Sequence, residues 1–156
     1  MTLLQELADA FHGRPPSEAW WYSPPAVPAG WEQIRVCRPS DGYDFARLDW
    51  QTCEECRTGY LVKIRVSPDW QRQGYATRIV ARALRGREAY RWNTTGQSAM
   101  AREFFPAFTA AAGVEFTVLE PTCAHMHAAR QPLYGTARKE RPPRLRRARG
   151  GALRAR

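Results

Sequence analysis

One stretch of the chain joins a strand, a loop and a helix, and it limits the possible folds more than any other stretch. Tyr60 to Val66 reads YLVKIRV, which is rich in β-branched residues and alternates in polarity, as strands do. We expect a helix from Thr77 to Leu84, ending near Gly86, and then a strand from Ala89 to Thr94. Such a strand–helix–strand unit makes its two strands parallel. The sequence therefore predicts a mixed α/β domain around this unit.

The amino-terminal third predicts one helix, one loop and two strands. Apolar residues from Leu3 to Phe11 recur at helical spacing. Five prolines between Pro15 and Pro28 exclude a helix there, and we expect an ordered loop pinned by aromatic residues. The stretches from Trp31 to Val36 and from Asp44 to Trp50 are typical of strands.

The carboxyl-terminal part of the domain predicts a helix and a last strand. Ser98 to Phe108 is expected to be helical, with Ser98 as the N-cap. Val114 to Glu120 is expected to be a strand that runs antiparallel beside Ala89 to Thr94. We therefore expect a single domain over residues 1–137.

Net charge is divided unevenly along the 156 residues. The chain has 24 Lys plus Arg and 15 Asp plus Glu, a formal charge of +9. Residues 138–156 contain nine basic residues and one acidic residue, a net charge of +8, which leaves +1 for residues 1–137. The segment 138–156 has too few apolar residues to offset the entropy of ordering it, so we expect a disordered tail. It is either a solubilising tail or an arm that contacts RNA, such as tRNA.

The loop after Val66 carries the main chemical signal. A turn from a strand into a helix exposes backbone N–H groups, and the helix dipole adds partial positive charge. Gly74 allows the backbone to approach a ligand closely, Ala76 keeps the second approach point small, and Arg72 can add a charged contact. Together these residues predict an anion site that suits a pyrophosphate.

These residues also match a known family. The segment from Gln71 to Ala76, QRQGYA, resembles the Gln/Arg-x-x-Gly-x-Gly/Ala loop of the GNAT acyl-CoA N-acyltransferases, and the resemblance extends from about Tyr60 to Phe108. It implies the GNAT fold, a twisted and mostly antiparallel sheet that splays at a central parallel pair of strands and carries flanking helices. It also implies that acetyl-CoA, or another acyl-CoA, binds in that opening as a co-substrate.

The resemblance assigns cofactor contacts residue by residue. The main chain near Val66 would hold the pantetheine arm, the loop and helix start would bind the pyrophosphate, and the Ser98 hydroxyl would face the cofactor. The implied cofactor-binding residues are Val66, Gln71, Arg72, Gln73, Gly74, Tyr75, Ala76, Thr77 and Ser98.

The catalytic groups are not assigned. Phe105 stands where many family members have a tyrosine that protonates the leaving thiolate, and phenylalanine cannot do so. Glu55 and Thr95 are the candidates for deprotonating or orienting the amine, with Asp49 and Glu54 as neighbouring alternatives. All three carboxylates are more typical of solvated charges.

Two cations occupy the predicted central strand. Lys63 and Arg65 fall on the same side of a regular strand as Leu61. They either face a polar cleft and bind an acidic substrate group, or reach solvent through their long stems.

Three cysteines and a histidine have spacings that are typical of a zinc site. Cys53 and Cys56 form a Cys-x-x-Cys knuckle, and Cys123 stands close to His125 and His127. Three thiolates and one imidazole are a common closed shell for structural zinc. The knuckle precedes the strand from Tyr60, and the expected antiparallel last strand would end at the same edge of the sheet.

The alternatives for these residues stay open. A reducing compartment disfavours disulfides, and the knuckle can also be a redox pair. The Cys-x-His-Met end resembles bacterial GNAT-like proteins with this knuckle, which favours His125 over His127 as the fourth ligand. Cys37 is expected to be a buried small apolar residue.

We therefore expect a cytoplasmic, bacterial enzyme that transfers an acetyl or other acyl group from coenzyme A to an amine. The start of the chain does not resemble a secretory signal, and no apolar run has the length of a membrane span. The acceptor can be a small molecule, a peptide or a protein. The alternatives are a protein that works with aminoacyl-tRNA or RNA through its tail, and a non-catalytic CoA-binding module. The sequence specifies neither the acyl group nor the oligomeric state.

Overall fold

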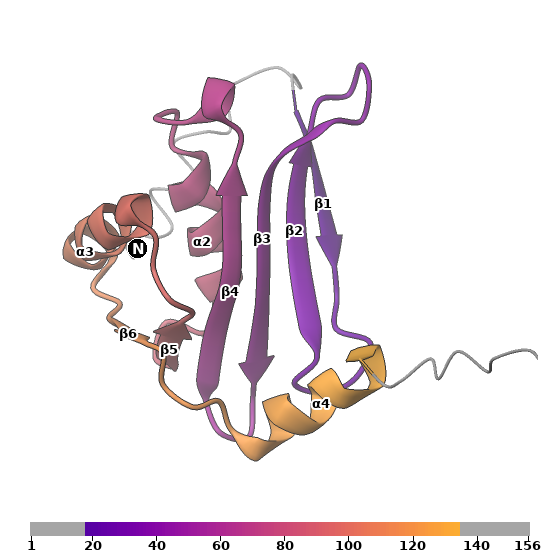
Figure 1. Cartoon of the computed structure of the whole chain (residues 1–156), viewed down its shortest axis with the longest axis vertical. Coiled ribbons are helices and arrows are strands. Elements are labelled where there is room, and N and C mark those ends of the chain that lie inside the picture. The colour runs from indigo at the N-terminus through magenta and orange to yellow at the C-terminus, as the bar shows by residue number, and fades with distance from the viewer. Residues whose placement is uncertain (1–17, 135–156) are drawn as a thin grey trace, which may run out of the picture.

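The computed structural model describes residues 18–134 (Figure 1). The helix expected from Leu3 to Phe11 and the basic segment 138–156 lie outside the described residues. One six-stranded sheet forms the centre, with its strands in chain order. The strands are β1 (Ala19–Ser23), β2 (Trp31–Cys37), β3 (Asp44–Cys53), β4 (Thr58–Val66), β5 (Arg91–Thr94) and β6 (Phe116–Val118).

The sheet is mixed. The pairs β1–β2, β2–β3 and β3–β4 are antiparallel, and β4–β5 is parallel as the βαβ unit predicts. The prediction for the last strand was wrong, because β6 pairs with β5 in parallel. The prediction of a loop before Pro28 was also wrong for Ala19–Ser23, which forms the edge strand β1; an edge strand tolerates nearby prolines because it needs ladder bonds on one side only.

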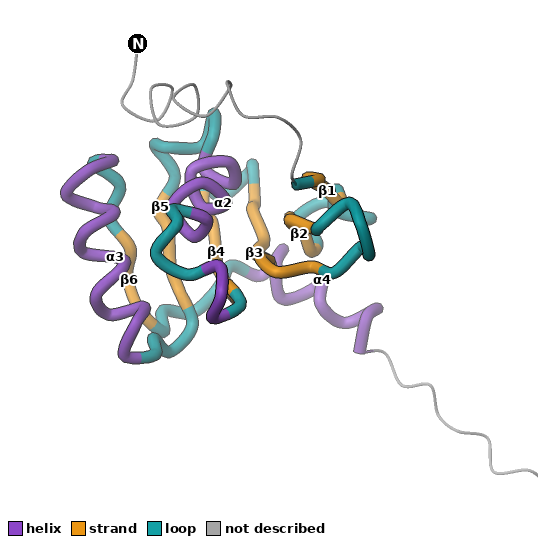
Figure 2. Tube along the Cα trace, turned by 90° about the horizontal axis from the view of Figure 1, so that it is seen from above, coloured by secondary structure: helices purple, strands orange, loops and turns teal. Residues whose placement is uncertain are grey.

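Helices cover different parts of this sheet. Helix α2 (Tyr75–Leu84) lies on one side, where its buried residues join Leu48, Trp50 and Leu61 in the core. Helix α3 (Ala99–Ala112) lies beside β5 and β6, and α4 (Ala124–Tyr134) crosses the opposite side at the lower end of β2 and β3 (Figures 1 and 2). Helix α4 was not predicted from the sequence. None of the described helices combines the length and apolarity of a membrane span.

A β-bulge in β4 overturns one prediction about side-chain direction. Leu61 pairs with Trp50, but the next pair, after a register shift, is Lys63 with Asp49. The extra residue, Val62, reverses the alternation, so Lys63 leaves the side of the sheet that Leu61 occupies. Leu61 is buried, whereas Lys63 is exposed on the polar side of the sheet.

Candidate functional site

A cleft forms where β4 and β5 part. Their last paired residues are Leu61 and Thr94. Thr95 then closes the junction, because its N–H donates to the Leu61 carbonyl at 3.2 Å and its hydroxyl donates to the Val62 carbonyl at 2.9 Å. Beyond this point β4 continues to Val66 with no strand beside it on this edge, among the described residues. Its main-chain groups are therefore open to a ligand.

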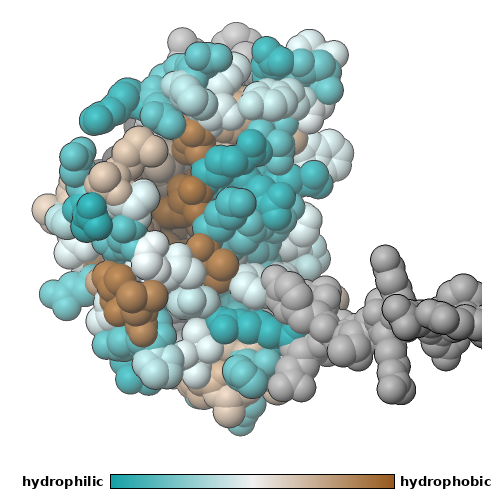
Figure 3. Space-filling view, viewed as in Figure 1, coloured by the Kyte–Doolittle hydropathy of each residue, from teal (hydrophilic) through white to brown (hydrophobic). Residues whose placement is uncertain are grey.

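A cavity of about 200 Å³ occupies the upper side of this junction. One wall is β4, and the other is the segment that leads from β5 into α3. The lining residues are Leu61, Val62, Lys63, Ile64, Thr94, Thr95, Gly96, Gln97, Ser98, Ala101 and Phe105. Figure 3 shows hydrophobic residues in a row along β4, with hydrophilic surface over β2 and β3 beside them.

The start of α2 provides unpaired backbone donors beyond the carboxyl end of β4. Gly74 is the N-cap with φ of 77°, a conformation that glycine adopts without strain. The first helical hydrogen bond runs from the Arg78 N–H to the Gly74 carbonyl at 3.0 Å, so the three preceding N–H groups have no carbonyl within the helix. Arg72 is exposed beside them. This end of α2 can hold an anion.

Side chains of this loop hydrogen-bond to the main chain of the loop and of the strand before it. Gln71 donates to the Val66 carbonyl at 3.0 Å, and Gln73 donates to the Asp69 carbonyl at 3.0 Å, around the short 3₁₀ turn Pro68–Trp70. The Tyr75 ring is buried, with its centroid 5.0 Å from that of Phe45. The loop residues that the resemblance assigns to the cofactor can therefore act chiefly through their main chain, together with the exposed Arg72.

Ser98 and Phe105 lie on the α3 side of the cavity. The Ser98 oxygen accepts from the Ala101 N–H at 3.3 Å, as an N-cap does, and its hydroxyl proton stays available to a ligand. Phe105 is buried and packs against Phe116, with 4.8 Å between ring centroids. Phenylalanine at this position gives the cavity an apolar wall and no acid.

The residues predicted to deprotonate or orient the amine do not lie together in the structure. Thr95 lines the cavity, whereas Glu55 lies at the opposite end of β4, in the turn between β3 and β4. Glu54 lies in the same turn and pairs with Arg87 at 3.3 Å. Among the described residues that line the cavity, none carries a carboxylate.

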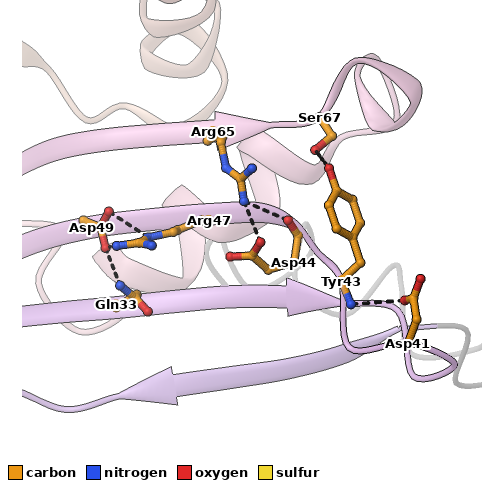
Figure 4. Close-up of polar contacts among 8 residues, drawn as sticks. All are labelled: Gln33, Asp41, Tyr43, Asp44, Arg47, Asp49, Arg65 and Ser67. Atoms are coloured by element: carbon orange, nitrogen blue, oxygen red, sulfur yellow. Dashed lines mark hydrogen bonds and ion pairs between the residues drawn. The ribbon is translucent and has the colours of Figure 1, made fainter.

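Asp49 belongs to a polar network on the side of the sheet that Lys63 occupies. Its carboxylate accepts from Arg47 at 3.0 Å and from Gln33 at 2.7 Å, and these three side chains point towards one another (Figure 4). Nearby, Arg65 donates to the Asp44 carboxylate at 2.7 Å. Arg65 therefore has a structural partner, whereas Lys63 reaches the mouth of the cavity.

A half-buried carboxylate that was not predicted from the sequence holds α2 against β1. Glu18 accepts from Trp20 at 2.9 Å, from Arg78 at 2.8 Å and from the Tyr75 hydroxyl. Burial alone would raise the pKa of Glu18, but these hydrogen bonds and the Arg78 charge lower it. The only signal in the sequence was an isolated Glu beside an aromatic run, so long-range pairing was needed to find it.

Glu18→Gln is expected to destabilise the protein at neutral pH and to matter less in acid. Because the folded-state pKa lies below the usual 4.5, the ionised form contributes stability above that pH, and the contribution is lost as pH falls through 4.5 and below. Melting temperatures of both proteins measured from neutral pH into acid should converge as pH falls. A constant difference at all pH values would contradict this origin.

The four residues of the predicted metal site meet at the lower end of the sheet. Cys53 ends β3, Cys56 lies in the following turn, and Cys123 and His125 stand at the start of α4. Their ligand atoms all lie within 4.8 Å of one another. His125 Nδ1 is 3.5 Å from Cys53 Sγ and 3.4 Å from Cys56 Sγ. His127 is not part of the cluster.

The thiols in this cluster differ in acidity. Burial raises the pKa of Cys123, but the Met126 N–H and the neighbouring thiols outweigh it and lower the pKa to about 7. The neighbouring Cys53 thiol is the largest cause that raises the pKa of Cys56 to about 11. Cys123 therefore ionises more readily than Cys56.

The route to this cluster differs from the expected one. Because β6 is parallel to β5, it ends at the end of the sheet opposite the cluster, and the chain must turn back to reach Cys123. It reverses at Leu119, which has φ of 60° and donates its N–H to the Thr94 carbonyl. The Asn93 amide then binds both the N–H and the carbonyl of Glu120, as β-pairing would. Asn93 is a positioning residue that the sequence analysis did not single out.

Comparison with known proteins agrees with this geometry. The profile of the family described as the acetyltransferase (GNAT) family matches residues 5–107, about two thirds of the chain. A search of curated proteins finds no match. The matched range contains the parting of β4 and β5, the loop from Gln71 to Ala76 and most of α3. The chain belongs to the GNAT family of acetyltransferases.

Proposed function

We propose that this protein transfers an acyl group from acyl-CoA, most simply acetyl-CoA, to the nitrogen of an amine. The observation that carries the proposal is the cleft where β4 leaves β5, close to the unpaired N–H groups of α2. An extended acyl-pantetheine arm needs hydrogen-bonding partners along its length, and a strand edge offers them at regular intervals. A pyrophosphate needs a cluster of donors, which a helix N-terminus offers.

Different residues of the cleft would bind different parts of acyl-CoA. The N–H groups of Tyr75, Ala76 and Thr77 would bind the pyrophosphate, and Arg72 would add positive charge. The open edge of β4 from Val62 to Val66 would hold the pantetheine arm, with Ser98 donating from the opposite wall. The apolar surface of Phe105 would exclude water from the thioester.

The reaction would depend on positioning. The amine nitrogen attacks the thioester carbonyl carbon, a C–N bond forms, and the C–S bond breaks to release the CoA thiolate. The nitrogen loses one proton to water, and the thiolate is protonated from solvent. Thr95, held at the junction by its hydrogen bond to Val62, can orient that water through its oxygen lone pairs. Holding two reactants in attack geometry is itself a large source of rate.

Gly74→Asp tests the binding site, and Gly86→Asp is its matched control. Both glycines have positive φ, 77° and 74°, and at neither would a Cβ meet an atom within 4 Å. Asp tolerates this conformation, so both variants should fold. At position 74 the carboxylate caps the N–H groups of α2 and repels a pyrophosphate, whereas position 86 lies beyond the other end of α2.

We expect Gly74→Asp to weaken acetyl-CoA binding about tenfold or more, which corresponds to about 1.4 kcal/mol, and Gly86→Asp to leave it unchanged. Calorimetric titration with acetyl-CoA and with CoA measures both. Release of free thiol with a panel of amines then measures transfer. Equal affinity in the two variants would remove the anion site, and binding without transfer to any amine class would favour the non-catalytic module.

A further inference from the structure

We propose that Cys53, Cys56, Cys123 and His125 bind one Zn²⁺ in a closed structural site that fastens α4 to the turn between β3 and β4, with Glu55 orienting His125. This inference does not depend on the acyltransferase activity. It rests on the ligand geometry, on a partner for the second imidazole nitrogen, and on the packing of α4.

The distances from His125 to two of the sulfur atoms match those around a tetrahedral zinc ion, and all four ligand atoms lie within 4.8 Å of one another. Zinc–sulfur bonds of about 2.3 Å and zinc–nitrogen bonds of about 2.0 Å place a sulfur and a nitrogen ligand about 3.5 Å apart. His125 Nδ1 lies 3.5 Å and 3.4 Å from the sulfur atoms of Cys53 and Cys56. Both cysteines and Cys123 are free thiols. The side chains are therefore arranged around one point at ligand spacing.

The backbone of the turn is arranged as a knuckle around that point. The Cys56 N–H lies 3.4 Å from Cys53 Sγ, so it can donate to the sulfur and disperse thiolate charge. Arg57, the next residue, has φ of 50°, which turns the chain back into β4. A non-glycine residue in this conformation is uncommon, and here it directly follows the second cysteine of the knuckle.

Glu55 holds the histidine from the other side of the ring. Its carboxylate lies 3.3 Å from His125 Nε2, while Nδ1 faces the sulfur atoms. A histidine that ligates a metal commonly donates its other ring N–H to a carboxylate, which fixes the tautomer and the ring orientation. Glu55, a candidate base from the sequence, is thereby a positioning residue for His125.

The described side chains of α4 attach it to the sheet through a small set of contacts, which a metal at the start of the helix would reinforce. Met126 is buried. The Gln51 amide donates to the Met126 carbonyl at 3.3 Å and accepts from the Arg130 guanidinium at 2.7 Å. Arg130 also lies over the rings of Trp31 and Tyr60. With Ala129, which is also buried, these residues form a small contact of mixed polarity between the described part of α4 and the sheet. Four protein ligands leave no open coordination position, so the zinc would be structural.

Metal content of the purified full-length chain tests the proposal directly. We expect one zinc ion per chain, and cobalt(II) titration of stripped protein should give the visible bands of tetrahedral thiolate coordination. Cys123→Ser and His125→Ala should lose the metal or these bands. Cys37→Ser, at a buried cysteine outside the cluster, and His127→Ala, at an exposed histidine on α4, should keep both.

Glu55→Gln separates orientation from ligation. It should keep the tetrahedral cobalt bands but weaken zinc affinity about 10- to 100-fold in competition with a chromophoric chelator. Unchanged affinity would overturn the role of Glu55. A folded unsubstituted protein that takes up neither zinc nor cobalt with its thiols reduced, or whose metal survives Cys123→Ser, would overturn the site. Because the cobalt titration uses the unsubstituted chain, a variant that fails to fold does not decide the result.

Discussion

Gly59→Ala is expected to lower the free energy of unfolding by about 3 kcal/mol, and Gly59→Val to prevent folding. A Cβ at Gly59 would lie 2.3 Å and 2.4 Å from Cε3 and Cζ3 of Trp92. Trp92 has no room to yield, because it is 1% exposed and its indole N–H donates to the Arg87 carbonyl at 3.0 Å. For a chain of this size the alanine variant should melt about 6–12 °C lower.

Two comparisons identify the cause of that loss. Gly96→Ala is the control, because its Cβ would meet only Leu119, at 3.9 Å, and we expect a change within about 0.5 kcal/mol. The clashing atoms belong to the six-membered ring of the indole. In a Trp92→Phe background, which lacks that ring position, the cost of Gly59→Ala should therefore fall by at least about 1 kcal/mol. An unchanged cost in the double variant would show that the strain lies elsewhere.

This contact marks the limit of what the sequence could predict. The strand Tyr60–Val66 and the helix after it were predictable because their periodicity and glycines are local signals. That Gly59 lies flat against Trp92 follows from the parallel register of β4 and β5, which pairs these two residues. The direction of β6 was also beyond local signals, since a short strand after α3 can join the sheet in either direction.

The candidate site shows the same division. The ligand set of Cys53, Cys56, Cys123 and His125 could be proposed from spacing and resemblance, and the structure brings these residues together. The expected route to them was wrong, and the chain returns through a turn at Leu119 instead. The bulge at Val62 could not be predicted either, because it depends on pairing with β3 rather than on the strand's own sequence.

Helix α4 and the carboxylate of Glu18 were missed for related reasons. The hydrophobic pattern of α4 is weak, because few of its described residues are buried apolar side chains, namely Met126 and Ala129, and Arg130 docks beside them on Gln51. Glu18 gains two of its partners, Tyr75 and Arg78, from α2, far along the chain. Polar contacts between distant segments have no periodic signature, so they appear only once the fold is known.

Glu32→Ala is expected to cost about 3–5 kcal/mol of stability, the range for removing one partner of a buried ion pair. Glu32 is 2% exposed, and side chains from β1, β3 and the turn after α2 meet at its carboxylate. It accepts from Tyr22 at 2.7 Å, from Thr52 at 2.6 Å and from Arg87 at 3.2 Å. Alanine would leave a cavity and a half-buried guanidinium without this partner, and urea denaturation measures the loss. Glu103→Ala, at an exposed position on α3, should change stability by less than about 0.5 kcal/mol.

A second measurement ties the loss to the carboxylate itself. Burial and the Glu32 carboxylate raise the pKa of Tyr22 to about 12. A folded-state pKa above the usual 10.0 means that the protonated hydroxyl contributes stability below pH 10, and that this contribution is lost as pH rises towards 12. The stability difference between the unsubstituted protein and Tyr22→Phe should therefore shrink over that range. In a Glu32→Gln background this stability difference should be smaller, and Tyr22 should ionise at a lower pH. The same pH dependence with and without the Glu32 charge would show that burial alone raises the pKa of Tyr22.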